Sequence, residues 1–337
     1  MKLGKKFIVF ISVLLSSGLL AGCGGGKGEA LEKIEPAEIQ NHLAEWEENL
    51  PKDGGEESLY AKALRGLSVQ KDGETVFAVS YEPREYKESF DYWDISVPYE
   101  SLVSVDTERL YELFDVVSGL VPEEISEDAL PTAEETGLKE SGTRIFIAYD
   151  GQQAAGEKGK PEPTAAREIQ IGQEDGKGHY YAKLSEDGET CLLKKAAVDA
   201  VLEVEPFSCI LKIPALIQID TVSEMAVSDG NQVRRMEREG ESWKLDGKTI
   251  SQEEFQKLYG EMLGVILSGE LPKDAQAEDE REVLLVLRFL RNVEGAPDVE
   301  VRYEDYDESS VSVSVNGKRQ FLAEKKDVEE LRELLYK

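Results

Sequence analysis

Hydrophobic and polar residues alternate from residue 67 onward in a way that predicts short antiparallel strands, tight turns and short helices. Four successive segments repeat the order of strands, a turn and then a helix. Asp-Gly and Asn-Gly pairs mark the turns, because these residues tolerate the positive φ angles of hairpin turns. The pairs are Asp72-Gly73, Asp187-Gly188, Asp229-Gly230, Asp246-Gly247 and Asn316-Gly317. The pattern predicts an α+β fold.

The strand segments are short runs of apolar and β-branched residues next to these turns. They cover residues 67–79, 144–149, 168–171, 180–184, 190–193, 225–227, 233–236, 243–245, 283–289, 299–303 and 311–315. Four helices follow strand segments. They are predicted from apolar residues at helical spacing: Leu110, Leu113, Val117 and Leu120; Ala197 to Leu202; Phe255, Leu258, Met262 and Val265; and Val328 to Leu335. Asp106 is the predicted N-cap of the first helix, and Ser251 with Glu254 forms a predicted capping box before the third.

The segments pair as an internal duplication. Asp106–Leu113 parallels Ser251–Leu258, with apolar residues at matching steps, and a tryptophan precedes each helix, at Trp93 and Trp243. The later hairpin and helix of each half also correspond. We therefore predict two diverged tandem copies of antiparallel strands and hairpins followed by a short helix.

An acidic helical segment is predicted ahead of these copies. Apolar residues recur in it at helical spacing, at Ile34, Ile39, Leu43, Trp46 and Leu50. The predicted organisation follows from these boundaries: a signal peptide at 1–22, a tether and acidic amphipathic helix at 23–66, a first α+β unit at 67–215 and a second at 216–337.

The first 23 residues have the parts of a secretory signal. Met1–Lys6 carries three lysines, Phe7–Leu20 is apolar, and Leu20-Ala21-Gly22-Cys23 places small residues before a cysteine. The apolar run is shorter than the roughly 20 residues of a membrane-spanning helix. Gly24-Gly25-Gly26 is typical of a flexible tether, which argues against a plain secretory signal.

The sequence resembles a bacterial lipoprotein precursor, and these four residues form its lipobox. The resemblance implies that the Cys23 sulfur receives a diacylglyceryl group and that cleavage falls between Gly22 and Cys23. Two acyl chains anchor a protein stably, so the expected location is the cell membrane, on its extracytoplasmic face.

Charge excludes some partners. The chain has 39 basic and 69 acidic residues. Removing residues 1–22 takes away three lysines and no acids, which leaves 36 basic against 69 acidic residues and a net charge of −33. Such a surface is repelled by phosphate, so no nucleic acid is expected as a partner. Anionic lipid headgroups repel it too, so the lipid is the expected membrane attachment.

Cys191 and Cys209 leave two interpretations open, since they can form a disulfide in an oxidising compartment or serve as buried free thiols. Residues Gly151–Thr164 are rich in glycine, proline, lysine and glutamate, which predicts an exposed, mobile loop.

No catalytic, metal-binding or cofactor-binding residue is predicted. The histidines are His42 and His179, and neither has zinc-ligand spacing. The serine-hydrolase elbow, the phosphate loop and the dinucleotide fingerprint are missing.

The acidic runs at 123–124, 278–280 and 304–308 lack the spacing of a calcium loop and are interpreted as solvated loops. The aromatic stretch from Tyr81 to Tyr99 is interpreted as core packing with Trp93 inside, and a sugar- or partner-binding surface is the alternative.

Further motifs carry a second resemblance. They are Thr136-Gly-Leu-Lys139, the strand 144–149, Ile169-Gln-Ile-Gly172, Tyr180-Tyr181 and Asp187-Gly188, after Trp93-Asp94-Ile95. In this order they resemble the bacterial domain-of-unknown-function 4340 family over most of residues 67–337. The resemblance implies an extracytoplasmic, membrane-attached protein that often occurs beside ABC-transport components, and it implies no catalytic residues. The charged insertion at 151–164 departs from the family pattern.

The expected function is therefore that of a non-catalytic interaction or accessory module near a membrane complex such as an ABC transporter. Two alternatives remain: a lipoprotein that binds a cell-wall glycan, peptide or cation, and an uncharacterised hydrolase.

Overall fold

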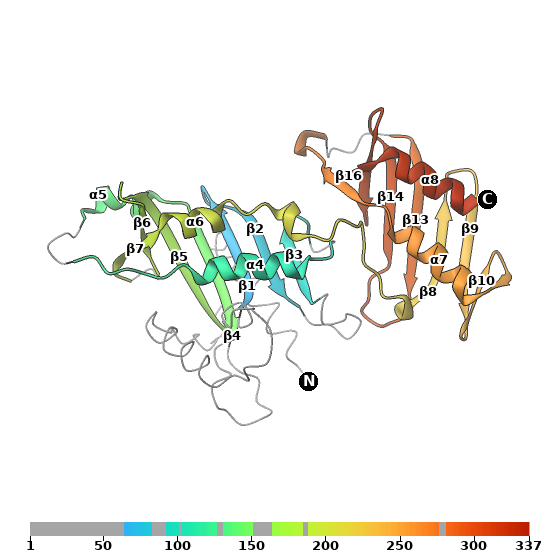
Figure 1. The fold of residues 1–337 in the computed structure, drawn as a ribbon, viewed down its shortest axis with the longest axis horizontal. Coiled ribbons are helices and arrows are strands. Elements are labelled where there is room, and N and C mark those ends of the chain that lie inside the picture. The colour runs from blue at the N-terminus through green and yellow to red at the C-terminus, as the bar shows by residue number, and fades with distance from the viewer. Residues whose placement is uncertain are drawn as a thin grey trace, which may run out of the picture. The chain divides into compact units, whose positions relative to one another are not determined.

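The structure is a computed structural model that describes residues 64–82, 92–100, 103–126, 131–150, 164–184, 188–275 and 281–336 (Figure 1). The lipobox and the predicted helix with its stripe from Ile34 to Leu50 lie outside the described residues. So do residues 151–163 of the predicted loop Gly151–Thr164, while Thr164 itself is the first residue of a strand. The chain divides into two compact units. The first is formed mainly by Asp106–Cys209 with the strands before Glu82, and the second mainly by Ile210–Lys337.

The first unit is built on a seven-stranded sheet in the order β3-β2-β1-β4-β5-β6-β7. Its strands are β1 (Leu64–Lys71), β2 (Glu74–Tyr81), β3 (Trp93–Val97), β4 (Arg144–Asp150), β5 (Thr164–Glu174), β6 (His179–Lys183) and β7 (Thr190–Lys194). Its helices are α4 (Thr107–Ser118), α5 (Ala133–Thr136) and α6 (Lys195–Leu202), with the 3-10 helices η3 (Leu138–Glu140) and η4 (Pro206–Cys209). Helices α4 and α6 cross the same face of this sheet (Figure 1).

The second unit is built on a nine-stranded sheet in the order β11-β10-β9-β8-β13-β14-β15-β16-β12. Its strands are β8 (Val222–Ser228), β9 (Val233–Glu239), β10 (Ser242–Leu245), β11 (Lys248–Ile250), β12 (Leu267–Glu270), β13 (Val283–Arg291), β14 (Val299–Asp305), β15 (Ser310–Val315) and β16 (Lys318–Glu324). Its helices are α7 (Gln252–Leu263) and α8 (Lys325–Tyr336), with η5 (Ile219–Thr221) and η6 (Lys273–Ala275).

The two sheets share one topology, which confirms the predicted α+β fold of two tandem antiparallel copies. Strands β3-β2-β1-β4-β5-β6-β7 of the first sheet correspond in order to β10-β9-β8-β13-β14-β15-β16 of the second. In the first copy α4 follows β3 and α6 follows the β6–β7 hairpin. In the second copy α7 follows β10 and β11, and α8 follows the β15–β16 hairpin. Helix α4 therefore corresponds to α7, and α6 to α8. Strands β11 and β12 are additions at the two edges of the second sheet.

Hairpin turns appear where the Asp-Gly and Asn-Gly pairs predict them. Both residues have positive φ at Asp72-Gly73, Asp246-Gly247 and Asn316-Gly317, as a type I′ turn requires. The turn at Asp229-Gly230 is longer, and the Asp229 carboxylate closes it by accepting the N–H groups of Asn231 and Gln232. These local signals therefore located four of the five predicted hairpin turns correctly, and the fifth, at Asp187-Gly188, falls partly on residues outside the described ranges.

Helix boundaries also follow the predicted caps. The Asp106 carboxylate accepts the N–H of Arg109, and Ser251 Oγ accepts the N–H of Glu254, one half of the predicted capping box. The sequence predicted that Leu113 lies on the buried side of α4, but Phe114 is buried there and Leu113 is only half-buried. The helix buries one stripe against the sheet, and Leu110, Phe114 and Val117 lie on it.

One face of each sheet forms a core with its helices. In the first unit Leu67 lies opposite Val79 and Ile147, and Ile145 lies opposite Val69 and Ile169, all buried. We call this the helix face of the first sheet. In the second unit Trp243 of β10 stacks on Phe255 of α7, with ring centroids 4.0 Å apart and planes at 8°.

A short segment from the middle of the chain completes the second unit. Tyr99–Val105, which follows β3, belongs to this unit. The Tyr99 ring is buried 5.2 Å from that of Phe321, and its hydroxyl donates to Glu270 at 2.7 Å. The Leu211 N–H donates to the Ser104 carbonyl, and the Leu216 N–H to Ser104 Oγ. The second unit therefore draws on residues far from its main stretch of chain.

Replacing Tyr99 tests this architecture. We expect Tyr99→Ala to destabilise the second unit by about 3–5 kcal/mol, because it leaves a cavity beside Phe321. Tyr99→Phe keeps the ring and removes one hydrogen bond, at a cost of about 0.5–1.5 kcal/mol. Denaturant-dependent hydrogen exchange of the β15 and β16 amides measures both. Equal losses in the two variants would contradict a core role for the ring.

Candidate functional site

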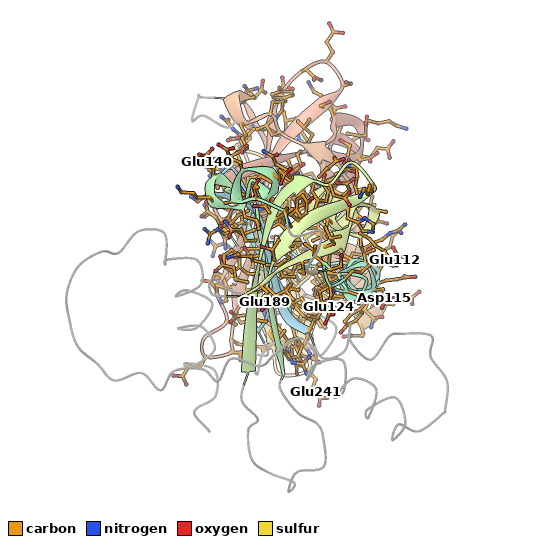
Figure 2. The ribbon with its side chains drawn as sticks, turned by 90° about the vertical axis from the view of Figure 1, so that its left-hand side faces the viewer. Glu112, Asp115, Glu124, Glu140, Glu189 and Glu241 are labelled. Atoms are coloured by element: carbon orange, nitrogen blue, oxygen red, sulfur yellow. The ribbon has the colours of Figure 1, made fainter. Side chains whose placement is uncertain are left out.

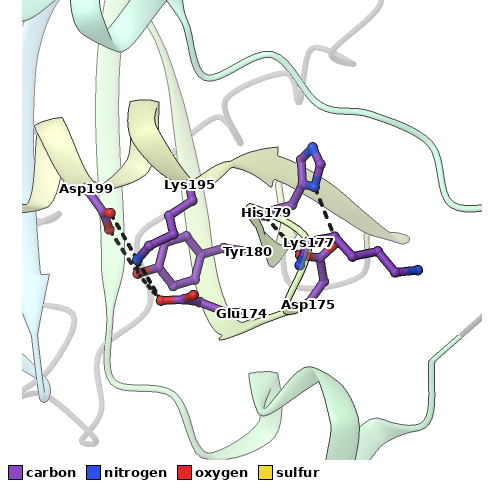
Figure 3. Close-up of polar contacts among 7 residues, drawn as sticks. All are labelled: Glu174, Asp175, Lys177, His179, Tyr180, Lys195 and Asp199. Atoms are coloured by element: carbon purple, nitrogen blue, oxygen red, sulfur yellow. Dashed lines mark hydrogen bonds and ion pairs between the residues drawn. The ribbon is translucent and has the colours of Figure 1, made fainter.

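A polar cluster in the first unit brings four titratable side chains into contact (Figure 3). Glu174 ends β5, Tyr180 lies on β6, and Lys195 and Asp199 lie one turn apart on α6. An irregularity in the β5–β6 register places Glu174 opposite Tyr180. Helix α6 follows β7 directly and crosses the helix face, which carries its first turn over the Tyr180 ring.

Lys195 is at the centre of this cluster. Its Nζ donates to Glu174 Oε1 at 2.6 Å and to the Tyr180 hydroxyl at 3.0 Å, and it lies 3.0 Å from Asp199 Oδ2. The Tyr180 hydroxyl in turn donates to Asp199 Oδ1 at 2.9 Å. Figure 3 shows the four side chains converging from two strands and one helix.

The surroundings keep Lys195 charged and Tyr180 neutral. Hydrogen bonds to Glu174, then to Tyr180 and Asp199, raise the pKa of Lys195. The Lys195 ammonium lowers the pKa of Tyr180, but desolvation and the Asp199 carboxylate outweigh it, so the Tyr180 pKa is raised. Desolvation raises the pKa of Asp199, but the hydrogen bonds from Lys195 and Tyr180 together outweigh it, so the pKa of Asp199 is lowered. A lysine or tyrosine that acts as a base needs the opposite shift.

His179 lies at the β5–β6 turn between two carboxylates. Its Nδ1 is 3.3 Å from Asp175 Oδ2, and its Nε2 is 3.7 Å from Glu123 Oε2. The Asp175 carboxylate also accepts the backbone N–H groups of Lys177 and His179. Desolvation opposes the effect of these bonds, yet the pKa of Asp175 is lowered. Since the carboxylates flank different ring nitrogens, they and the imidazole do not converge on one metal ion.

The acidic runs are engaged in ion pairs and turns. Glu304 pairs with Arg319 at 3.4 Å, and Asp305 with Lys325 at 2.6 Å. The Asp307 carboxylate accepts the N–H groups of Ser309 and Ser310, which lower its pKa. No metal-binding group of three or more side chains occurs among the residues that the structure describes. Residues 278–280 lie outside the described part of the chain.

Many other carboxylates are exposed. Six of them are labelled in Figure 2: Glu112, Asp115, Glu124, Glu140, Glu189 and Glu241. Since these side chains belong to α4, to η3 and to connecting loops, the negative charge is spread over several elements. On the part of the surface that the structure describes, the negative charge is therefore distributed over several elements.

The remaining predicted candidates have structural surroundings. Cys191 and Cys209 are free thiols, Cys191 half-buried and Cys209 buried, so the structure favours the free-thiol interpretation over the disulfide. Trp93 is buried, as predicted, and so is Tyr99. The aromatic residues between 83 and 91 lie outside the described range, as do Cys23 and His42.

The motif residues Thr136–Lys139 and Ile169–Gly172 form a packing contact. Gly137 has a φ of 61°, which turns the chain from α5 into η3. Gln170 Nε2 donates to the Leu138 carbonyl at 2.7 Å. A Cβ on Gly172 would overlap the Thr136 carbonyl oxygen, so glycine is required for this close approach. These motif residues therefore hold the α5–η3 turn against β5.

Comparison of the chain with protein families, with curated proteins and with solved structures gives no match. The resemblances to a lipoprotein precursor and to the domain-of-unknown-function 4340 family therefore remain predictions. Within the described ranges, no helix has the length and apolar composition needed to cross a membrane.

Sequence reasoning missed the Lys195 cluster. The spacing of Lys195 and Asp199 was the available signal, because residues four apart on a helix face each other. Glu174 and Tyr180 join them through strand register, which the local sequence does not reveal.

Removing the Lys195 ammonium tests the electrostatic account. In Lys195→Met we expect the pKa of Asp199 to rise towards the ordinary carboxyl value of about 4, measured by NMR titration. The native pKa is lowered, so the ion pair stabilises the fold above the pKa of the unfolded chain and loses this effect on acidification. The stability difference between wild type and variant should therefore shrink below about pH 4.

Lys194→Met is the matched control, because Lys194 is more exposed and lies 3.8 Å from Glu123, outside the cluster. An Asp199 pKa that moves equally in both variants would refute the specific pairing with Lys195.

The packing role of Gly172 is tested by Gly172→Ala. We expect a loss of about 1–3 kcal/mol in unfolding free energy, because the backbone of the α5–η3 turn must shift. Gly260→Ala in α7 is the control: its Cβ would meet nothing within 4 Å, so we expect a gain of about 0.5–1 kcal/mol. Urea denaturation measures both, and a neutral Gly172→Ala would argue against the close approach.

Proposed function

We propose that this protein is a lipid-anchored extracytoplasmic lipoprotein that serves as a non-catalytic interaction or accessory module near a membrane complex. The observation that carries the proposal is Leu20-Ala21-Gly22-Cys23 after a charged and then apolar N-terminus. In this proposal Cys23 carries a diacylglyceryl group, which attaches the body to the membrane. An ABC transporter is the expected kind of complex, on the basis of the family resemblance alone.

The chemistry of the described side chains supports the non-catalytic part. The Lys195 cluster combines a charged ammonium, a neutral phenol and a carboxylate of lowered pKa, a combination that stabilises an ion pair. A lysine or tyrosine that acts as a general base has a lowered pKa, whereas the pKa values of Lys195 and Tyr180 are raised. The motif around Gly172 is explained by packing and needs no catalytic role.

Two similar folding units on one lipid tether also support an interaction role. The outer face of the second sheet, which carries the exposed residues Arg235, Glu237 and Arg288, is available for contacts with a partner, whereas catalysis needs groups that converge on one point. A surface with a net charge of −33 in the mature chain favours partners with basic patches and disfavours the lipid headgroups themselves.

Comparing wild type with Cys23→Ala in the native cell tests the anchor and the role together. We expect the wild type to incorporate labelled fatty acid, while the variant stays unlabelled and accumulates as unprocessed precursor. Crosslinking mass spectrometry on wild-type membranes should recover a membrane-protein complex, and the variant should lose those crosslinks.

Each part of the proposal has its own contrary outcome. Normal processing of Cys23→Ala would sink the lipoprotein assignment. A labelled wild type that crosslinks to no membrane protein, yet gains thermal stability with a glycan or peptide, would replace the accessory role with ligand binding.

A further inference from the structure

The first sheet has a second face, opposite α4 and α6, and a patch of this face on β1, β2 and β4 is made of small and apolar residues beside the Arg144–Glu168 ion pair. We call it the back face, and its members are Gly66, Ser68, Ala78, Ser80, Phe146 and Ala148. They form one patch over three neighbouring strands, because Ser68 lies opposite Ala78 and Phe146, while Gly66 lies opposite Ser80 and Ala148. Residues directly opposite on paired strands share a face.

This back face is buried. Ala78 is 2% exposed, Ser80 4%, Ala148 4% and Phe146 8%. The oxygen Ser68 Oγ is inaccessible and has no hydrogen-bond partner within the described part of the chain. Helices α4 and α6 do not account for this burial, since they lie on the helix face, where Asp199 of α6 meets Tyr180. On the back-face side, α5 and η3 pack against β5 and β6.

The second unit provides an internal comparison, because it repeats the same topology. Strands β9 and β13 correspond to β2 and β4. On the face away from α7 and α8 they carry Arg235, Glu237, Arg288 and Leu290, all exposed. Arg288 pairs with Glu300 at 2.6 Å on that face. The same surface is therefore charged and solvated in the second copy but apolar and buried in the first.

We propose that the segment Ile34–Leu50 docks on the back face of the first sheet through its stripe of apolar residues. Its position in the chain supports this, since it lies just before β1, the strand at the centre of the patch. Its stripe supplies large apolar side chains, among them Leu43 and Trp46, for a surface of small ones. The loop at 151–163 connects β4 and β5 of the same sheet, but it contains no large apolar residue.

Charge favours this site over the membrane surface. Residues 27–63 contain four lysines against ten aspartates and glutamates. Amphipathic helices that lie on membranes have lysine and arginine on their polar face, which anionic headgroups attract. Anionic headgroups repel the acidic polar side of this segment, so that side is expected to face solvent. The apolar stripe is then expected to contact protein.

Docking would shorten the tether, a consequence that rests on the proposed lipid at Cys23. With Ile34 held on the sheet, only residues 24–33 remain free, and ten extended residues reach about 35 Å. With the whole stretch 24–63 free, forty residues reach about 140 Å. The docked segment would therefore keep the first unit close to the membrane and restrict the partners within its reach.

Photocrosslinking in the full chain, expressed in the native cell, tests the docking. A benzophenone amino acid replaces Trp46 in the apolar stripe, and in a matched control it replaces Glu48, which lies on the opposite side of the predicted helix. We expect position 46 to crosslink within the chain to peptides from 64–82 or 144–150, several-fold more strongly than position 48. Mass spectrometry identifies the linked peptides.

Equal yields from both positions overturn the proposal, as do crosslinks from position 46 to lipid, to another protein or only to α4 and α6. Phe146→Asp should reduce the crosslink from position 46, and Arg288→Asp, on the corresponding face of the second unit, should leave it unchanged. Repeating the experiment in Cys23→Ala separates the two proposals. An intramolecular crosslink that persists without lipid labelling supports docking alone, and a labelled protein without the crosslink supports the anchor alone.

Discussion

The rest of the structure depends on one constraint: an antiparallel sheet satisfies its backbone hydrogen bonds internally, but each of its two faces must be covered or be polar. The helix face of the first sheet meets this requirement by packing Leu67, Ile145 and Ile147 beneath α4 and α6. In the second unit Trp243 and Phe255 stack to close the equivalent core. The short helices of both copies are held in place mainly by this burial.

The opposite faces show how the two copies diverged. In the second sheet Arg288 and Arg302 share Glu300, so charge can remain in water at little cost. In the first sheet the corresponding area is built from residues such as Ala78 and Phe146, which leave it apolar. A duplication of the fold therefore did not duplicate the surface, and the two units present different chemistry from one topology.

The fold was predictable where its signals are local. Asp72-Gly73 and Asn316-Gly317 identify their hairpins because the positive φ angles are required by the turn itself. Strand β16 was missed, since Arg319 is buried through its pairing with Glu304 and so masks the alternation of polar and apolar residues. Strands β3, β11 and β12 were missed because three to five residues carry too little periodicity.

The site and the unit boundaries depend on contacts between distant residues, which a local pattern does not encode. Tyr99 enters the core of the second unit through Phe321 and Glu270, more than 170 positions further along the chain. Tyr180 meets Lys195 only because β7 returns the chain past β6 before α6 begins. The sequence pattern singled out both tyrosines, but it did not show which residues they contact, because those contacts depend on how the strands pair.

Electrostatics connects these features to the proposed role. Several of the scarce cations are already paired inside the units, as Lys195 is with Glu174 and Lys325 with Asp305. Each of these cations is matched by at least one carboxylate, so the surplus of carboxylates, Glu124 and Glu241 among them, remains on the surface. A body charged in this way gains nothing from approaching anionic headgroups. If Cys23 carries the proposed lipid, the length of free chain after Cys23 would set the distance of the body from the membrane, and that length would determine which partners it can reach.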